Sequence, residues 1–382
     1  MKTYDIVIIG GGIVGGSIAF ELAKRKLNVA VLDRQELMHE ASWAAAGMLS
    51  PAPDSPAAIP VVPLGRASLA MYSKFVDEVE QASGISTGYR TGGAVMVISS
   101  GDAQVELDKL VALHRRLGLA CDPLPLEKAR IMEPALGKDA LATALLPDEC
   151  SIEPRPLTAA VLDAASAAGV TLLPGTEVVS LALDGKKCVG VKTSTGETIH
   201  ASQVVLAAGC WSSQILNAVP YAPTVPLRGQ MIALRNSGTP IRNVLRSEHG
   251  YIVPRGRMSP QTLILGSTIE NAGYEKRVTS GGLEKILAAA NALVPELANA
   301  EVIETWSGLR PGTPDELPIL GPADIGGLVF ATGHYRNGIL LAPITAKLVG
   351  EWITEKKTSM DWETFSPLRF LPSGLNLSTH IS

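Results

Sequence analysis

The sequence predicts an α/β chain, α+β overall, in which a Rossmann-like domain is combined with a discontinuous, sheet-rich second domain. Three observations predict this fold. A glycine-rich turn follows the first apolar strand directly, strand and helix patterns of the same kind return late in the chain, and strand patterns dominate between them. At 382 residues the chain also exceeds one typical core, so two domains are expected.

The N-terminal strand, residues 4–9, runs into a G-x-G-x-x-G turn formed by Gly10, Gly12 and Gly15. Gly10 permits the tight turn, Gly12 lets backbone N–H groups approach a pyrophosphate, and Gly15 lets the following helix, 14–25, pack close to the strand. The positive end of that helix then faces the phosphates. The alternative interpretation is a glycine-rich structural turn.

A second strand, 29–32, ends at Asp33, eighteen residues after Gly15. A carboxylate at about this spacing can hydrogen-bond the ribose hydroxyls of an adenosine dinucleotide. Strand, helix, second strand and acid in this order predict dinucleotide binding, which the glycine turn alone would not.

The remaining elements follow from periodicity and turn residues. A proline-rich stretch, 50–56, is interpreted as an ordered loop. Helices are expected at 64–79, 105–117, 157–168, 282–293 and 340–352. Strands are expected at 94–98, 171–173, 177–183, 188–193, 204–209, 229–234, 251–254, 263–266 and 327–333. We assign 1–85, 146–220 and 300–365 to the Rossmann-like, dinucleotide-binding domain, and 86–145 and 221–299 to the sheet-rich second domain.

Composition excludes several classes of protein. Apolar residues at 46% and charged residues at 18% are typical of a globular protein, and aromatic residues at 4% leave the core mainly to aliphatic side chains. A net charge of −4 without a run of Lys or Arg gives nucleic-acid binding little support.

The four cysteines, which have no C-x-x-C spacing, indicate reduced thiols of a cytoplasmic protein. Apolar residues 6–20 are interrupted by five glycines and lack a basic leader, and no long apolar run follows, so neither a signal peptide nor integral membrane contact is expected.

Three later segments carry candidate chemistry. In 40–48, small residues allow backbone to lie against a cofactor and Ser42 can bind a phosphate, although the segment taken alone favours an ordinary alanine-rich helix start. In 306–315, Arg310 lies between Gly and Pro residues and can bind a carboxylate bidentately; the alternative is an arginine on the surface or in a structural ion pair.

In 331–341, a helix begins after Gly338, and its N-terminus can stabilise negative charge on an electron-rich ring. His334 there invites a catalytic-base interpretation, against which stands a structural hydrogen-bonding role. The six histidines show no metal-ligand spacing, so no metal is predicted.

These segments together resemble the FAD-dependent amine and amino-acid oxidase family, which includes D-amino-acid oxidase, sarcosine oxidase and glycine oxidase. The resemblance covers nearly the whole chain and is closest to the glycine oxidase branch, the ThiO type associated with thiamine biosynthesis. It is carried by IIGGGIVGGSIA, ASWAAAGML, HGYIVPR, WSGLRPGTPDELPILG and GHYRNGILLAP.

The resemblance implies FAD and assigns site residues position by position. Ile13, Val14, Asp33 and Arg34 would contact the ADP half of FAD, and Val178 would hold adenine through its backbone. Ala41, Ser42, Ala46, Gly47 and Met48 would line the pyrophosphate and flavin. Gly209, at the end of the 204–209 strand, is included in the cofactor site. The isoalloxazine would be wrapped by His334, Tyr335, Arg336, Asn337, Gly338, Ile339 and Leu340. Arg310 would bind the substrate carboxylate with Tyr251 and Arg336 beside it, and His249 would lie near the pocket mouth.

Two departures from the family pattern bear on this assignment. Some sarcosine oxidases tether the flavin through a cysteine near the position of Arg310, but no cysteine follows Cys210 here, so the FAD should be non-covalent. Trp43 places a bulky ring where the family often has a small residue.

The resemblance implies that the protein oxidises glycine or another small amino acid or amine, with O₂ as electron acceptor. It also implies a homo-oligomer, since the glycine oxidases of this group are expected to be tetramers. Three alternatives remain open. They are a dehydrogenase of D-amino acids or secondary amines that passes electrons to a quinone, an oxidase for another amine, and an FAD-holding subunit for assembly or electron relay.

Overall fold

The first sheet of the computed structural model, which describes residues 3–371, is an eight-stranded sheet with the parallel centre of a Rossmann-like fold. Its order is β10-β11-β12-β1-β2-β9, and β19 pairs with β12 and β18. The bounds are β1 (Thr3–Ile9), β2 (Val29–Leu32), β9 (Thr171–Leu173), β10 (Val178–Asp184), β11 (Lys187–Thr193), β12 (Thr198–Leu206), β18 (Ile319–Pro322) and β19 (Leu328–Thr332). Three separated parts of the chain therefore build this one sheet.

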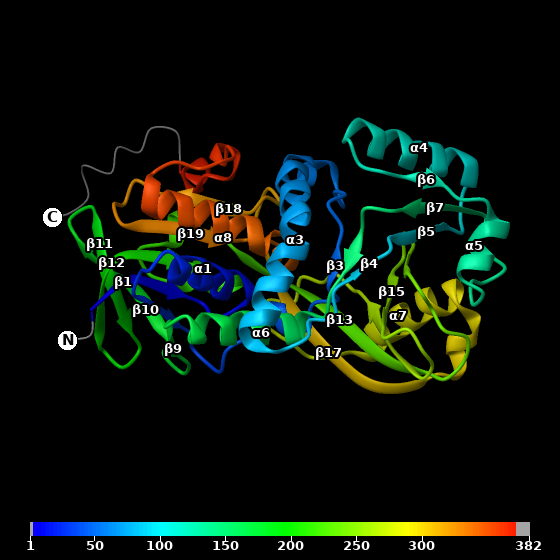
Figure 1. Ribbon diagram of the computed structural model, residues 1–382, viewed down its shortest axis with the longest axis horizontal. Coiled ribbons are helices and arrows are strands. Elements are labelled where there is room, and N and C mark those ends of the chain that lie inside the picture. The colour runs from blue at the N-terminus through cyan, green and yellow to red at the C-terminus, as the bar shows by residue number, and fades with distance from the viewer. Residues whose placement is uncertain (1–2, 372–382) are drawn as a thin grey trace.

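Both faces of the parallel centre of the first sheet are buried, as parallel strands require. Along β1, Ile6 and Ile8 pack into the core on the helical side, whereas Val7 and Ile9 pack into the core formed with β10–β12. The helical side consists of α1 (Ile13–Lys24), α3 (Val62–Ser83), α6 (Pro154–Ala167) and α8 (Gly338–Glu355), which contact one another (Figure 1).

The second eight-stranded sheet is mostly antiparallel and lies on the other side of α3 and α6 in Figure 1. Its order is β17-β13-β16-β15-β14-β5-β7-β6. The bounds are β5 (Ala94–Ile98), β6 (Asp122–Pro123), β7 (Ala142–Leu146), β13 (Val225–Asn236), β14 (Val244–Arg246), β15 (Tyr251–Arg255), β16 (Gln261–Gly266) and β17 (Glu301–Gly312). It is accompanied by α4 (Ala103–Arg116), α5 (Leu126–Met132) and α7 (Ser280–Leu293). A small third sheet consists of β3 (Met48–Leu49), β8 (Cys150–Ser151) and β4 (Arg90–Thr91). The four-residue α2 (Ala41–Ala44) contacts α6 on one side and β17 of the second sheet on the other.

Short 3₁₀ segments complete the described chain: η1 (Pro56–Val61), η2 (Gly209–Gln214), η3 (Val219–Tyr221), η4 (Pro295–Asn299), η5 (Glu363–Phe365) and η6 (Pro367–Phe370). The predicted domain boundary at residue 300 does not agree with the way the strands pair. β17 pairs with β13 along most of its length, so residues 301–312 lie in the second sheet, whereas we predicted them in the dinucleotide-binding domain. The domain division itself stays a prediction.

The first turn of α8 is tied to α3 by side-chain hydrogen bonds. Pro343 lies inside α8 and has no N–H, so the carbonyl of Ile339 lacks its helical donor. The buried Tyr72 of α3 donates its hydroxyl to this carbonyl at 3.0 Å, and Ser68 donates to the carbonyl of Leu340 at 2.5 Å. These contacts fix the start of α8.

We predict that Tyr72→Phe lowers the free energy of unfolding by about 1–3 kcal/mol, because it leaves the buried Ile339 carbonyl unpaired. The measurement is urea unfolding of the purified protein. Tyr89→Phe is the matched control, since the Tyr89 hydroxyl meets only the sulfur of Cys150, at 3.6 Å, and should cost less. Equal losses in both variants would contradict the role given to Tyr72.

Candidate active site

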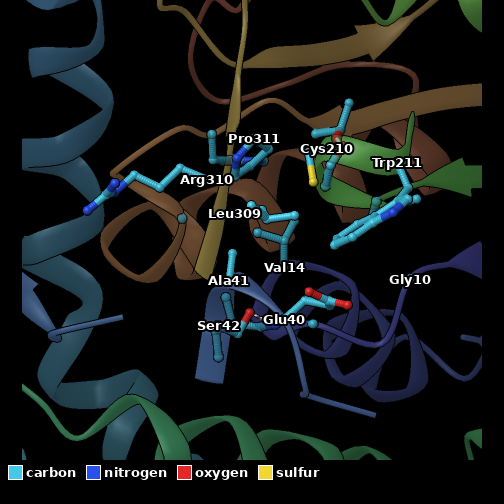
Figure 2. A pocket seen from close by; sticks show the side chains of 18 of the residues that line it. Gly10, Val14, Glu40, Ala41, Ser42, Cys210, Trp211, Leu309, Arg310 and Pro311 are labelled. Carbon is cyan, nitrogen blue, oxygen red and sulfur yellow. Dashed lines mark hydrogen bonds between the residues drawn. The ribbon is translucent and has the colours of Figure 1, made fainter. Parts of the chain in front are cut away.

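A cavity of about 340 Å³ lies where the carboxyl ends of the β1, β12 and β19 strands meet the second sheet. Figure 2 shows Arg310 and Trp211 toward opposite sides of it, with Ala41 and Ser42 below. Most predicted site residues line this cavity: Gly10, Gly12, Ile13, Val14, Asp33, Arg34, Ala41, Ser42, Ala46, Gly47, Met48, Val178, Gly209, Tyr251, Arg310, His334, Tyr335, Arg336, Gly338 and Ile339. Gly15, Asn337 and Leu340 are not among the lining residues.

The glycine-rich turn aims α1 at the cavity. Gly10 has a φ of +111°, and a Cβ there would overlap the carbonyl of Ala207. A Cβ on Gly15 would overlap the carbonyl of Gly10, so Gly15 serves the close packing of helix on strand. The N-cap of α1 is Gly12, which offers no side-chain cap, and Ser42 Oγ accepts a hydrogen bond from Ile13 N–H at 2.9 Å. The other first-turn N–H groups are left for an anion.

Next to this turn, the acidic residue Asp33 and the stacked pair of Arg34 and Trp211 line one side of the cavity. Asp33 Oδ2 accepts a hydrogen bond from Gly11 N–H at 2.7 Å, and burial raises the pKa of Asp33 although this bond opposes the rise. The guanidinium of Arg34 lies 3.8 Å from the ring centre of Trp211 and pairs with Glu40 at 2.9 Å. Sequence reasoning missed Trp211, which follows the strand end at Gly209 in a stretch that already carried a cofactor signal.

The 41–48 segment forms the wall between the two large sheets. Gly47 has a φ of +79°, and a Cβ on it would overlap the carbonyl of Ile152. The Arg255 side chain donates to the carbonyls of Ala46 and Ile152, at 2.6 and 2.9 Å, and its burial lowers its pKa to about 10. Arg255 is the last residue of the HGYIVPR motif, but no role could be predicted for it, because nothing in the sequence shows that β15 faces the 41–48 segment.

Trp43 does not point into the cavity. Its ring stacks with the guanidinium of Arg155, 3.6 Å away, and meets Trp306 edge-on at 6.1 Å between ring centres. It is absent from the lining residues. The bulky ring therefore packs α2 against α6 and β17 and leaves the cavity unobstructed.

A second helix N-terminus, that of α8, also faces the cavity. Its N-cap Asn337 makes no side-chain capping bond, and Gly338 and Ile339 line the wall. The N–H groups of this first turn are thus free for an electron-rich group.

His334 lies deep beside this helix start. Its Nε2 is 3.1 Å from Thr345 Oγ1, and burial lowers its pKa to about 4. It is therefore neutral near pH 7 and bonded to α8, an arrangement that favours the structural interpretation over the catalytic base.

On the Arg310 side, three predicted residues come together: Tyr251 from β15, Arg310 from β17, and Arg336 from the segment between β19 and α8. Arg310 donates to the Ser267 hydroxyl at 2.7 Å and to the Thr268 carbonyl at 3.1 Å, and burial lowers its pKa. Tyr251 lines the same space with its hydroxyl 3.5 Å from the sulfur of Met231. Arg336 pairs with Asp54 at 3.1 Å. His249 is exposed, pairs with Glu248 at 3.2 Å and does not line the cavity.

Two strand glycines that sequence reasoning missed make room for these side chains. A Cβ on Gly229 of β13 would overlap the guanidinium of Arg310, and a Cβ on Gly266 of β16 would approach the Tyr251 hydroxyl to 2.5 Å. Glycine inside a strand is the available signal, since it often marks a close approach.

The donor set of this cavity fits FAD. Two uncapped helix N-termini face one elongated space that also holds an acidic residue at the ribose spacing, which matches a pyrophosphate, a ribose and an electron-rich ring. Among residues 3–371 no cluster of three or more metal-binding side chains occurs, and no helix is long and apolar enough to span a membrane.

Comparison with known proteins agrees with this geometry. The family model "DAO: FAD dependent oxidoreductase" matches residues 5–352. The chain belongs to this family. The glycine oxidase of Geobacillus kaustophilus is 35% identical over 372 residues, covering 96% of this chain and 97% of that protein. The crystal structure of glycine oxidase from the same organism superposes with a TM-score of 0.91 at 33% identity, covering 97% of this chain and 100% of that one.

A third relative is longer than this chain. The bifunctional protein ThiO/ThiG of Synechocystis is 37% identical over 97% of this chain, which spans only 54% of that protein's length. The predicted family, fold class and FAD cofactor are confirmed. The protein is therefore an FAD-dependent oxidoreductase that acts on amines or amino acids.

We predict that Gly229→Ala raises the KM for an amino-acid substrate about tenfold or more while FAD content stays unchanged, because the added methyl displaces Arg310 from its position. Steady-state kinetics and the flavin-to-protein ratio test this, with Arg310→Ala as the reference for a lost guanidinium. Gly281→Ala is the control, since a Cβ there meets nothing. An unchanged KM in Gly229→Ala would show that Arg310 does not hold the substrate.

The buried His334 predicts a pH-dependent stability. Histidine in the unfolded chain titrates near 6.5 and His334 in the folded protein at about 4, so the unfolded chain binds the extra proton between these values. The free energy of unfolding should therefore fall, by up to about 3 kcal/mol, as the pH drops from 6.5 toward 4. In the His334→Gln variant, this pH-dependent decrease in the free energy of unfolding should be absent. The measurement is urea unfolding at a series of pH values with saturating FAD. Parallel pH profiles of variant and wild type would contradict the assignment.

Proposed function

We propose that the protein is an FAD-dependent oxidase that oxidatively deaminates glycine and other small amines or amino acids. The amine becomes an imine, water hydrolyses the imine to an oxo acid and ammonia, and O₂ is reduced to H₂O₂. For glycine the balanced sum is glycine, O₂ and water giving glyoxylate, ammonia and H₂O₂. The observation that carries the proposal is the partly buried Arg310, which lines the cavity and whose hydrogen-bond partners in the structure are both neutral.

The cofactor would be held along its length by residues of the first sheet and its helices. Gly10, Gly12, Ile13, Val14 and Ser42 would bind the pyrophosphate, with Gly15 setting the helix in place. Asp33, Arg34, Val178 and Gly209 would hold the adenosine. Ala41, Ala46, Gly47 and Met48 would line the flavin on one side, and the α8 segment on the other, with Asn337 and Leu340 supporting it from behind. FAD supplies a two-electron acceptor for the hydride of the substrate's α-carbon.

The substrate would be oriented by its carboxylate. Arg310 offers a planar fork of donors to it, and the Tyr251 hydroxyl lies within the same space. Positioning of this kind makes the reaction effectively unimolecular. The substrate's ammonium loses its proton to water, because the neighbouring His334 is bonded to Thr345 and titrates far below neutral pH.

The relatives support this choice of substrate and setting. Several carry the name glycine oxidase, and others the name ThiO/ThiG. We therefore propose a place in thiamine biosynthesis, a cytoplasmic location and a homo-oligomer, such as the tetramer expected from the resemblance. The alternative is a dehydrogenase of the same fold that passes electrons to a quinone.

Anaerobic reduction of the purified holoenzyme tests the proposal. Glycine, sarcosine, D-alanine, D-proline and L-amino acids are added in turn, the flavin absorbance is followed, and air is then admitted. We expect glycine or another small amine to bleach the flavin, and air to restore it rapidly with formation of peroxide. Bleaching followed by slow recovery in air supports the quinone-linked alternative, and no bleaching by any amine refutes both.

A further inference from the structure

The Arg310 side of the cavity contains more charge than one substrate carboxylate needs. Three guanidinium groups lie on or behind this side: Arg310 and Arg336 line the cavity, and Arg246 lies behind the lining residue Tyr251. Arg246 lies opposite Tyr251 in the register of β14 and β15, and its side chain is 14% exposed. Two of the three have acidic partners. Arg246 pairs with the buried Glu149 at 2.5 Å, and Arg336 pairs with Asp54 at 3.1 Å.

Arg310 differs from the other two. Among residues 3–371 no carboxylate lies within ion-pairing distance of it, and its bonds go to the hydroxyl of Ser267 and the carbonyl of Thr268. Of these three guanidinium groups, Arg310 is thus the one without an acidic partner, and it lines the cavity. The charge complement of this region is therefore a single carboxylate.

Asp54 determines this balance. It lies in the proline-rich 50–56 loop, between Ser50, which bonds to both Arg246 and Glu149, and Ser55. Burial lowers the pKa of both Arg246 and Arg310, and the charge of Asp54 opposes this in each; with Glu149, it leaves the pKa of Arg246 above its usual value, whereas that of Arg310 stays below. Asp54 thus acts on all three arginines from the edge of the cavity, although its side chain is one-third exposed.

We propose that Asp54 is a specificity-determining residue that restricts the enzyme to substrates with one carboxylate. While Asp54 holds Arg336, a second carboxylate on the substrate meets an arginine that is already neutralised and a nearby negative charge. Without Asp54, Arg336 is free to bind it. This inference rests on the proposed amino-acid substrate, and its first test needs no turnover.

Two ligand pairs differ only by one carboxylate. Methoxyacetate and diglycolate are ethers without an oxidisable amine, and sarcosine and iminodiacetate are the corresponding amines. Binding of each ether to the FAD-bound enzyme is measured by titration of the flavin absorbance or by calorimetry. The kcat/KM of each amine is measured from peroxide formation or anaerobic flavin reduction.

For the wild type we expect the monocarboxylate of each pair to be preferred. Asp54→Asn should shift that preference toward the dicarboxylate by about tenfold, since it frees a charge-assisted bidentate donor that solvent partly screens. Asp54→Ser is a second variant, in a loop that already contains serines. Asp77→Asn is the matched control, because it removes one exposed carboxylate from the nearby helix α3.

The outcomes separate the two proposals. If no amine reduces the flavin, the proposed function fails, while the ether pair still tests Asp54. If both Asp54 variants keep the wild-type preference, or Asp77→Asn shifts it equally, the role of Asp54 is refuted. A shift confined to the Asp54 variants supports it.

Discussion

The contact between the first turn of α1 and the end of β1 determines where the cavity lies. Gly15 of the helix rests on the carbonyl of Gly10, and Gly10 in turn rests on the carbonyl of Ala207 after β12. No side chain larger than hydrogen fits at either position, so helix and sheet approach at backbone distance. The α1 N-terminus is thereby directed at the edge of the sheet where β1, β12 and β19 end. The α8 N-terminus, tied to α3 through Tyr72, reaches the same edge from the other side.

The second sheet completes the cavity with buried cations. Burying a guanidinium is costly unless hydrogen bonds or an opposite charge compensate it. Arg255 is compensated by the carbonyls of Ala46 and Ile152, and so holds the wall of the cavity in place. Arg246 is compensated by Glu149. Arg310 also has neutral acceptors alone, but unlike Arg255 it lines the cavity, so a carboxylate that enters the cavity can pair with its charge.

Much of this arrangement could be predicted from the sequence, where a local pattern carries a physical requirement. The Gly10–Gly15 turn, Asp33 and the strand-to-helix break before Gly338 are signals of this kind. β17 was not predicted, because Gly308, Pro311 and Gly312 are typical of a loop. In the structure a Cβ on Gly308 would overlap the Ala44 side chain, so this glycine serves packing between α2 and β17. Contacts between distant segments, such as Gly229 with Arg310, Arg255 with Ala46, and Asp54 with Arg336, have no local pattern, and only the folded chain brings them together.

The central claim is that Arg310 is the one arginine of its group left for the substrate carboxylate. The most direct measurement is a crystal structure of the FAD-bound protein with glycolate, a non-amine analogue of glycine. The account predicts both carboxylate oxygens on the Arg310 guanidinium, with Arg336 still paired to Asp54. A carboxylate bound by Arg336 with its Asp54 pair broken, or one that does not touch Arg310, would contradict it.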